Sequence, residues 1–238
     1  MKKNTLTIIA LVLMAALLMG CGSASKTETP AEKPADETSA DAGTPLGGWS
    51  APESFEITEE QRDAFGEATQ GMMGVSYEPI ACLGRQVVSG TNYALLCRGL
   101  AIVPDAKPYY TVAYIYINLQ GEAQLLGFRD MTPNGEFVQD AAGGLLGGWS
   151  VPEDQADGMA AFEKAMEGLT GVNYVPVQVI GQQIVSGTNY CVLTQSTTVY
   201  PGAAPAFTLV TVYKDLEGNA RMTDAVELTV PGAPEQLG

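Results

Sequence analysis

Few side chains in this sequence are of the types that carry out chemistry. The chain of 238 residues has no histidine and four cysteines. Without histidine it lacks the commonest general base, the Ser-His and Cys-His nucleophile pairs and the commonest metal ligand. The sequence also has no cluster of residues with metal-ligand spacing and no phosphate-binding loop. We therefore predict a protein that is not an enzyme, has no catalytic residues and needs no metal or cofactor.

Instead of reactive groups, the sequence offers a short motif that occurs twice. Gln86–Tyr93 (QVVSGTNY) returns at a spacing of 97 residues as Gln183–Tyr190 (QIVSGTNY). In each copy, β-branched residues precede Ser-Gly, and Thr-Asn-Tyr follows. This order predicts the end of one strand, a tight turn and the start of the next strand. Such a turn would act by filling space rather than by reacting.

The cysteines of the repeated region predict one covalent link and one inert thiol. Cys82 and Cys97 lie symmetrically about a turn between Ser89 and Gly90. In an antiparallel hairpin they would be cross-strand neighbours, within reach of a disulfide in an oxidising compartment. Two buried thiols are the alternative. Cys191 has no second cysteine in its copy and no histidine to activate it, so we expect a buried, unreactive thiol.

The N-terminus has the layout of an export signal. Residues 1–20 contain Lys2 and Lys3, an apolar run and a final small residue before Cys21. The run is too short and wrongly flanked for an ordinary membrane span. Leu18–Cys21 resembles the bacterial lipobox, which implies cleavage before Cys21 and a lipid, diacylglycerol with acyl chains such as palmitate, on its thiol. A plain signal peptide or an uncleaved anchor is the alternative.

This resemblance predicts an extracytoplasmic protein that is lipid-anchored to the bacterial membrane. The lipidated cysteine begins a segment, residues 21–45, that is rich in Ser, Thr, Ala, Glu, Pro, Asp and Lys. The segment has almost no large apolar side chain and cannot bury enough surface to order itself. We expect a disordered tether between the membrane and the folded part.

The charge of the chain argues against several partners. The formal net charge is −15. Without residues 1–20, which contain two lysines and no acid, 10 basic residues face 27 acidic residues. Such a surface argues against binding to nucleic acid or docking on anionic lipid, and it favours basic partners.

The first copy, residues 46–132, predicts one helix followed by an antiparallel meander. Thr58–Gln61 fits a capping box, and apolar residues at helical spacing follow, which predicts a helix over 59–71. The expected strands are residues 77–88, 91–103, 109–119 and 123–128. A helix laid across one face of such a sheet is an α+β unit.

The second copy, residues 146–230, repeats this order. Leu146–Ser150 repeats Leu46–Ser50, and residues 171–194 align with residues 74–97 without gaps at 13 of 24 identical positions. An apolar stripe predicts the second helix. Its members are Met159, Phe162, Met166 and Leu169. The chain therefore reads as a tandem duplication, with a linker over 133–145 and a tail over 231–238.

Taken together, these motifs resemble the cystatin/stefin family of cysteine-protease inhibitors. Both copies have Gly-Gly before the first helix, then Gln-x-Val-x-Gly, then Thr-Asn-Tyr as in stefins. The resemblance implies an α+β fold of two tandem cystatin-like domains, each with one α-helix packed across a four- to five-stranded antiparallel sheet. It also implies a function, the reversible inhibition of papain-like cysteine proteases.

In that family, three elements form an edge that wedges into the protease cleft: the Gly-Gly segment, the Gln-x-Val-x-Gly hairpin and a second hairpin. Carried over to this chain, the resemblance implies two sets of protease-binding residues. The first set is Leu46, Gly47, Gly48, Gln86, Val87, Val88, Ser89, Gly90, Leu119, Gln120 and Gly121, and the second is Leu146, Gly147, Gly148, Gln183, Ile184, Val185, Ser186, Gly187, Leu216, Glu217 and Gly218.

Two other interpretations of the sequence remain open. A cystatin-like frame in a lipoprotein also suits non-inhibitory cell-surface adhesion or ligand binding, because one fold hosts many functions. The Gln-x-Val-x-Gly motif, in turn, also suits a hairpin that is well formed and has no binding role.

Overall fold

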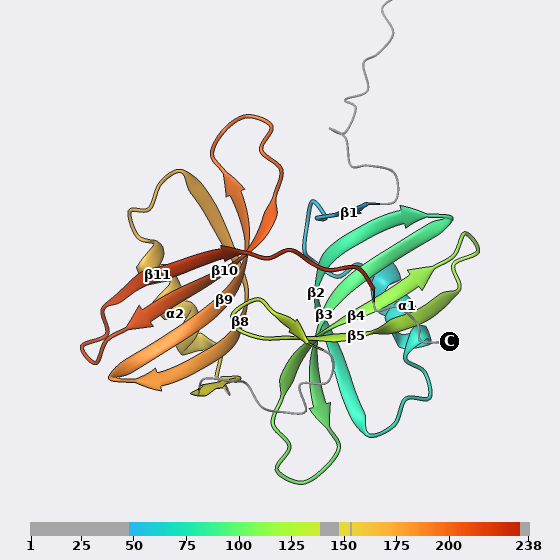
Figure 1. Ribbon diagram of the computed structural model, residues 1–238, viewed down its shortest axis with the longest axis horizontal. Coiled ribbons are helices and arrows are strands. Elements are labelled where there is room, and N and C mark those ends of the chain that lie inside the picture. The colour runs from blue at the N-terminus through green and yellow to red at the C-terminus, as the bar shows by residue number, and fades with distance from the viewer. Residues whose placement is uncertain (1–47, 139–147, 153, 234–238) are drawn as a thin grey trace, which may run out of the picture. The chain divides into compact units, whose positions relative to one another are not determined.

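The computed structural model describes residues 48–138, 148–152 and 154–233, which form two β-sheets and two short helices (Figure 1). In chain order the elements are β1 (Trp49–Ser50), α1 (Glu59–Ala68), β2 (Val75–Val88), β3 (Gly90–Ala101), β4 (Tyr109–Ile117), β5 (Ala123–Met131), β6 (Phe137–Val138), β7 (Trp149–Ser150), α2 (Ala156–Met166), β8 (Val172–Val185), β9 (Gly187–Thr198), β10 (Ala206–Lys214) and β11 (Ala220–Glu227).

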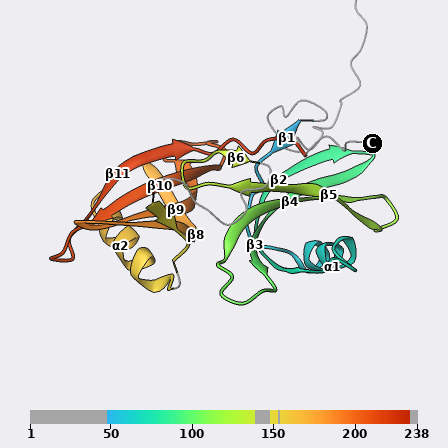
Figure 2. The same cartoon turned by 60° about the horizontal axis from the view of Figure 1, so that its bottom comes forward.

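Both sheets are antiparallel, and their strand orders follow the chain. The first sheet has the order β1-β2-β3-β4-β5-β6 and the second has the order β11-β10-β9-β8-β7. Bulges interrupt the β2–β3 ladder between Pro79 and Ala81 and between Cys82 and Gly84, and two matching bulges interrupt the β8–β9 ladder. Bulges bend a strand and increase its twist, and both sheets are visibly curved (Figure 2).

The first helix begins where the sequence predicts. The Thr58 side chain accepts a hydrogen bond from the Gln61 backbone N–H, and the Gln61 side chain accepts one from the Thr58 N–H, so the predicted capping box is confirmed. The helix ends at Ala68, earlier than the predicted residue 71. Ala64 and Phe65 are buried against the first sheet, and Ala161, Phe162 and Ala165 of α2 are buried against the second.

The largest apolar cluster joins the two sheets rather than a sheet and a helix. Its buried residues from the first sheet are Ala81, Leu83, Ala94, Leu96, Tyr110, Val112, Tyr114 and Met131, and those that follow β7 are Ile180, Cys191, Leu193, Phe207, Leu209 and Leu228. Polar contacts accompany this shared core. The Gln178 side chain donates to the Tyr110 hydroxyl at 2.8 Å, and the Cys191 thiol lies 3.1 Å from the Pro133 carbonyl oxygen.

The predicted fold class is therefore wrong. The sequence suggested an α+β fold with two tandem cystatin-like domains, each built by a helix across a four- to five-stranded sheet. The described protein is mostly β: its helices have 10 and 11 residues, whereas β2 and β8 have 14 residues each. The physical reason is the shared core, which buries the second face of the central strands by sheet-to-sheet packing.

The disulfide predicted between Cys82 and Cys97 does not form, and both thiols are free and buried. The β2–β3 turn centres on Ser89, since Val88 pairs with Gly90. The two bulges then shift the register further, so that Cys82 lies opposite Leu95 and Cys97 lies opposite Pro79. A shift of this size separates residues that symmetric counting along the sequence would place side by side.

Several sequence predictions concern residues that the structure does not describe. The signal peptide over 1–20, Cys21 and the tether all lie outside the described residues. Within the described ranges, no helix combines the length and the apolar character needed to cross a membrane. The predicted linker over 133–145 is described as far as Val138, and there β6 pairs with β5 and extends the first sheet.

Truncation of the shared core is expected to destabilise both sheets together. Leu193 is fully buried in that core, and Leu193→Ala should lower the free energy of unfolding by about 2–5 kcal/mol. Trp49 reports on the first sheet and Trp149 on the second. In urea unfolding of single-tryptophan variants, the midpoints reported by Trp49 and by Trp149 should shift to lower urea concentration by the same amount.

The control variant is Leu216→Ala, at an exposed position, which should change the free energy of unfolding by less than about 0.5 kcal/mol. A shift confined to Trp149 would show that the two sheets unfold independently.

Candidate functional site

The repeated motif forms a very tight turn with an apolar tip. Val88 at the end of β2 pairs with Gly90 at the start of β3, so Ser89 alone connects the strands. Val87 is 56% exposed and Val88 is 42% exposed. In the second sheet, Val185 pairs with Gly187, and Ile184 is 71% exposed. Each turn therefore presents branched apolar side chains to solvent at the end of a long hairpin.

The glycine of each turn allows β4 or β10 to approach closely. Gly90 has a φ of 136°, and a Cβ atom there would lie 2.4 Å from the Ile117 carbonyl oxygen. Gly187 has a φ of 126°, and its Cβ would lie 2.4 Å from the Lys214 carbonyl oxygen. A side chain at either position would require both a strained backbone and a displaced neighbouring strand. The Gly of the motif is thus a structural requirement of the turn.

Side-chain hydrogen bonds hold the turns from two sides. The Tyr116 hydroxyl of β4 donates to the Ser89 carbonyl oxygen at 2.7 Å, and Tyr213 of β10 donates to Ser186 at 2.6 Å. Two residue pairs from each turn, the asparagine amide donates to the glutamine side-chain oxygen, Asn92 to Gln86 at 2.7 Å and Asn189 to Gln183 at 2.8 Å. The polar residues of the motif therefore support the turn, while its apolar residues remain available for contact.

A second turn lies beside the first at the same end of each sheet. In the β4–β5 turn, the Asn118 side-chain oxygen accepts hydrogen bonds from the backbone of Gln120 and Glu122, both at 2.9 Å, and Leu119 is 79% exposed. In the β10–β11 turn, Asp215 accepts from the Asn219 backbone at 2.7 Å, and Leu216 is 81% exposed. Since β3 pairs with β4 and β9 with β10, the two exposed tips are neighbours.

The segment with the paired glycines reaches the same region through a short strand. Trp49 pairs with Gln86 and Trp149 pairs with Gln183, which places Gly48 and Gly148 beside the first turn of their respective sheets. The Trp49 ring packs closely on Gly84 and meets the Tyr114 ring edge-on at a centroid distance of 5.7 Å. The residues Leu46, Gly47, Leu146 and Gly147 lie outside the described residues.

Each sheet therefore has one end at which three predicted elements come together. We call these ends the first edge (Gly48, Val87–Gly90 and Leu119–Gly121) and the second edge (Gly148, Ile184–Gly187 and Leu216–Gly218). A pocket of about 270 Å³ lies at the first edge, between Glu60 of α1 and the two turns. Its lining includes Val87, Val88, Tyr93, Ile117 and Leu119.

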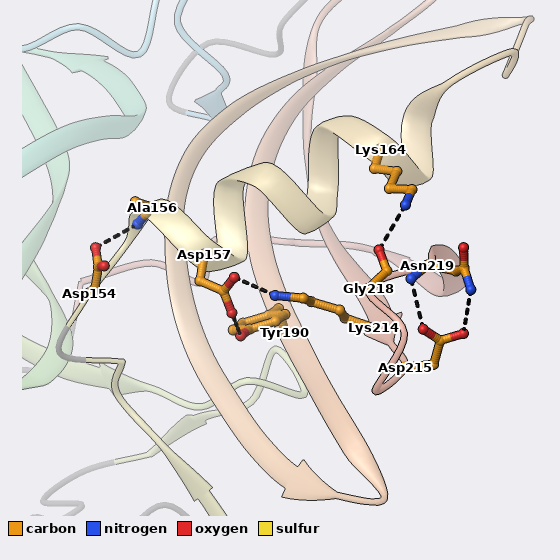
Figure 3. A network of polar contacts seen from close by, with 9 residues as sticks. All are labelled: Asp154, Ala156, Asp157, Lys164, Tyr190, Lys214, Asp215, Gly218 and Asn219. Carbon is orange, nitrogen blue, oxygen red and sulfur yellow. Dashed lines mark hydrogen bonds and ion pairs between the residues drawn. The ribbon is translucent and has the colours of Figure 1, made fainter.

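Beside the second edge, the side chains form a polar network (Figure 3). Asp157 of α2 accepts a hydrogen bond from the Tyr190 hydroxyl and forms an ion pair with Lys214. These two donors, Lys214 first, lower the pKa of the Asp157 carboxyl below its ordinary value. Burial and Asp157 raise the pKa of Tyr190 to about 12, so Tyr190 remains a donor at neutral pH. Lys164 also donates to the Gly218 carbonyl oxygen at 2.8 Å.

The buried thiols lie away from the two edges and are poorly suited to nucleophilic chemistry. Burial raises the pKa of Cys82 to about 11 and the pKa values of Cys97 and Cys191 to about 12. A thiol with such a pKa is almost entirely protonated at neutral pH. Within the described ranges, no group of three or more His, Cys, Asp and Glu side chains is arranged to hold a metal ion.

The sequence motif identified the tips and some of the residues that support them, such as Gln86 and Gly90, but not the supporting tyrosines. Tyr116 and Tyr213 recur at the same spacing of 97 residues as the motif, and that recurrence is the signal that marks them. Glu60 and Lys214 carry no such signal, because they become neighbours of the tips through tertiary packing. Comparison with protein-family models found no match to this chain, and comparison with curated proteins found no significant match.

Gly90→Ala is expected to be far more harmful than Gly121→Ala. Both glycines have a positive φ, but a Cβ at Gly121 would meet nothing within 4 Å, whereas at Gly90 it would collide with backbone. Gly121→Ala should cost only the backbone strain, about 1–2 kcal/mol. Gly90→Ala should cost at least about 3 kcal/mol or displace β4. If urea unfolding shows that both variants lose the same free energy of unfolding, the proposed role of the close approach between Gly90 and Ile117 is contradicted.

Because of the ion pair between Asp157 and Lys214, the stability of the folded protein should depend on pH. Because the folded-state pKa of Asp157 is depressed, its contribution is present above the ordinary value of 3.8 and is lost as the pH falls through the folded-state pKa. The gap in thermal midpoint between the native chain and Asp157→Asn should therefore be largest near neutral pH and should close on acidification. Glu163→Gln, an exposed carboxylate on the same helix outside the network, is the control and should show no comparable gap. A gap that persists unchanged in acid would contradict the assignment.

Proposed function

We propose that the protein is a surface-anchored, reversible inhibitor of papain-like cysteine proteases that inserts its edges into the active-site cleft. The observation that carries the proposal is the exposure of apolar side chains on two adjacent, locked turns. At the first edge these are Val87, Val88 and Leu119. A strand preceded by a glycine runs alongside them at each edge, which supports a three-part wedge of the kind that the motif resemblance implies.

The rigidity of the turns favours tight contact. The tyrosine hydrogen bond, the close approach at the glycine and the Gln-Asn pair already restrict each turn in the free protein. Little conformational entropy is then lost on binding. Burial of the exposed apolar tips contributes roughly 25 cal/mol per Å² of surface removed from water. Both effects support a wedge that binds without any covalent step.

The same restraints explain how a turn inside a protease cleft would escape cleavage. In this proposal the tip fills the cleft while its backbone remains bent around Ser89, whose carbonyl oxygen is already bonded to Tyr116. A bent, hydrogen-bonded turn presents no correctly placed scissile bond to the catalytic thiol. The inhibitor therefore acts by excluding substrate.

The anchoring part of the proposal comes from the N-terminal sequence. Lys2, Lys3 and the apolar run form the export signal, the lipid on Cys21 holds the protein at the outer side of a bacterial membrane, and residues 22–45 are the tether. A tethered inhibitor stays at high local concentration near the surface that it protects. The acidic composition supports partners with a basic surface.

The alternative function is non-inhibitory adhesion or ligand binding by the same edges. The observation that favours it is the mostly β architecture with a core shared by two sheets, which departs from the α+β fold that the motif resemblance implied. Exposed apolar tips on such a frame also suit a partner without a protease cleft.

Inhibition of papain by the purified chain tests the proposal directly. Val88→Glu and Val185→Glu each place a charge on one tip, and burial of that unpaired charge in a cleft is unfavourable. Together they should weaken inhibition by at least about 100-fold, which corresponds to ~3 kcal/mol of binding free energy. Each single variant should remove the contribution of its own edge.

Matched controls place the same charge at the opposite ends of the same sheets. Ile102 follows β3 and Val199 follows β9, and both side chains are largely exposed. Ile102→Glu and Val199→Glu should leave inhibition unchanged. The proposal fails if micromolar native chain inhibits neither papain nor cathepsin-like enzymes. A partner that binds the tip variants as well as the native chain would favour the adhesion alternative.

A further inference from the structure

The pocket at the first edge combines one carboxylate with a mixed lining, in which Thr91 and Asn118 lie beside Val87, Ile117 and Leu119. Its volume of about 270 Å³ lies just below the range typical of small-molecule sites, so its size suits a single side chain. Glu60 lines it from the first turn of α1 and is exposed. Within the described ranges, the ion pair that the structure contains is formed by Asp157 and Lys214, and Glu60 has no cationic partner.

The second sheet repeats the positions that surround this pocket. Glu60 and Asp157 are both the second residue of their helices, and Tyr93 and Tyr190 both end the repeated motif. Ile117 pairs with Thr91 at the end of β4, just as Lys214 pairs with Thr188 at the end of β10. The acid, the phenol and the strand end are therefore equivalent in the two sheets.

What differs is the residue at the strand end. In the second sheet, the Lys214 ammonium reaches the carboxylate of Asp157, which also accepts the Tyr190 hydrogen bond (Figure 3). In the first sheet, Ile117 is apolar and buried and offers no cation. Burial and then the charge of Glu60 raise the pKa of Tyr93, as expected for a phenol near an uncompensated carboxylate. Lys214 thus marks the place of an ammonium that the first sheet lacks.

We propose that the pocket of the first edge binds a lysine side chain of a protein partner. The partner ammonium meets Glu60 and the Tyr93 hydroxyl in the position that Lys214 takes at the second edge. The aliphatic stem lies against the apolar part of the lining, which includes Val87 and Leu119. The excess of acidic residues in the chain attracts a partner that presents such a lysine.

This inference rests on the proposed function for one point only: a protein bound across the tips of the first edge brings its lysine over the pocket. The chemistry of the pocket is independent of whether that protein is a protease. It is therefore tested with a lysine probe and without any protease, so failure of one proposal leaves the other standing.

The probe is Nα-acetyl-lysine N-methylamide, titrated into the 15N-labelled chain at low salt. Amide shifts that saturate at Val88, Thr91 and Leu119 are expected. The norleucine analogue has a similar apolar chain and no ammonium, and it should bind at least about fivefold more weakly, the scale of one exposed ion pair. Absence of saturating shifts, or equal binding of the norleucine analogue, would overturn the proposal.

Two neighbouring carboxylates provide a matched pair of variants. Glu59 and Glu60 are both exposed in the first turn of α1, and only Glu60 lines the pocket. Glu60→Gln should lower the affinity for the lysine probe by about fivefold, and Glu59→Gln should leave it unchanged. Arg85→Gln removes a cation that pairs across the strands with Tyr93 and should leave binding intact. Unchanged affinity in Glu60→Gln, or an equal loss in Glu59→Gln, would refute the assignment of Glu60.

The equivalence of the two sheets gives a reciprocal test. Lys214→Ile removes the internal ammonium, leaves Asp157 and Tyr190 in place, and should create a second site for the lysine probe, with new saturating shifts at Val185 and Leu216. Ile117→Lys should fill the first pocket from within and abolish binding of the probe there. If Lys214→Ile gains no site, the equivalence fails and the proposal fails with it.

Discussion

Burial of both faces of the central strands is the constraint on which the rest of the structure depends. Along β4, Tyr110, Val112 and Tyr114 enter the core shared by the two sheets, while Ala113 and Ile115 pack in the cluster that contains the helix residue Phe65. Because both faces of these strands are covered, neither face is available to a partner. The ends of the hairpins remain, and there branched apolar side chains are exposed and adjacent. The edges that we propose for binding are thus a consequence of how the core is built.

The sequence predicted the locally determined parts of the fold. The capping box at Thr58 and Gln61, the main strands and a tight turn in the repeated motif depend on residues close in the chain, and local patterns describe them well, although the turn centres on Ser89 and not between Ser89 and Gly90. The shared core was missed because it joins Leu83 to Leu193, which are distant in sequence. The run of β4, which apart from Thr111 consists of aromatic and apolar residues, was a signal of burial on both faces, since a strand with one solvated face alternates polar and apolar residues.

The candidate site was predicted in part for the same reason. The motif identified the exposed tips, yet its most constant residues, such as Gln86, Gly90 and Asn92, support the turn and do not themselves provide the apolar contact. Their recurrence in both copies therefore reflects the geometry of a hairpin pressed against the next strand. Among the contact positions, Val87 has Ile184 as its counterpart, whereas Val88 and Leu119 match Val185 and Leu216. Identity of the polar and glycine positions accordingly says more about shared structure than about a shared partner.

The two copies differ at the strand-end position that determines the charge of each edge, which is Ile117 in the first copy and Lys214 in the second. A lysine at the end of β10 neutralises Asp157 within the protein, whereas with an isoleucine at the end of β4 Glu60 has no cationic partner among the described residues. The ion pair is partly exposed, so its contribution to stability is small, and its main effect is on what the edge presents to a partner. The second edge presents apolar tips beside a compensated charge, and the first presents them beside an uncompensated carboxylate. A duplicated frame has in this way acquired two edges that differ in charge through a single residue at a strand end; if both edges bind, as we propose, this difference would favour different partners.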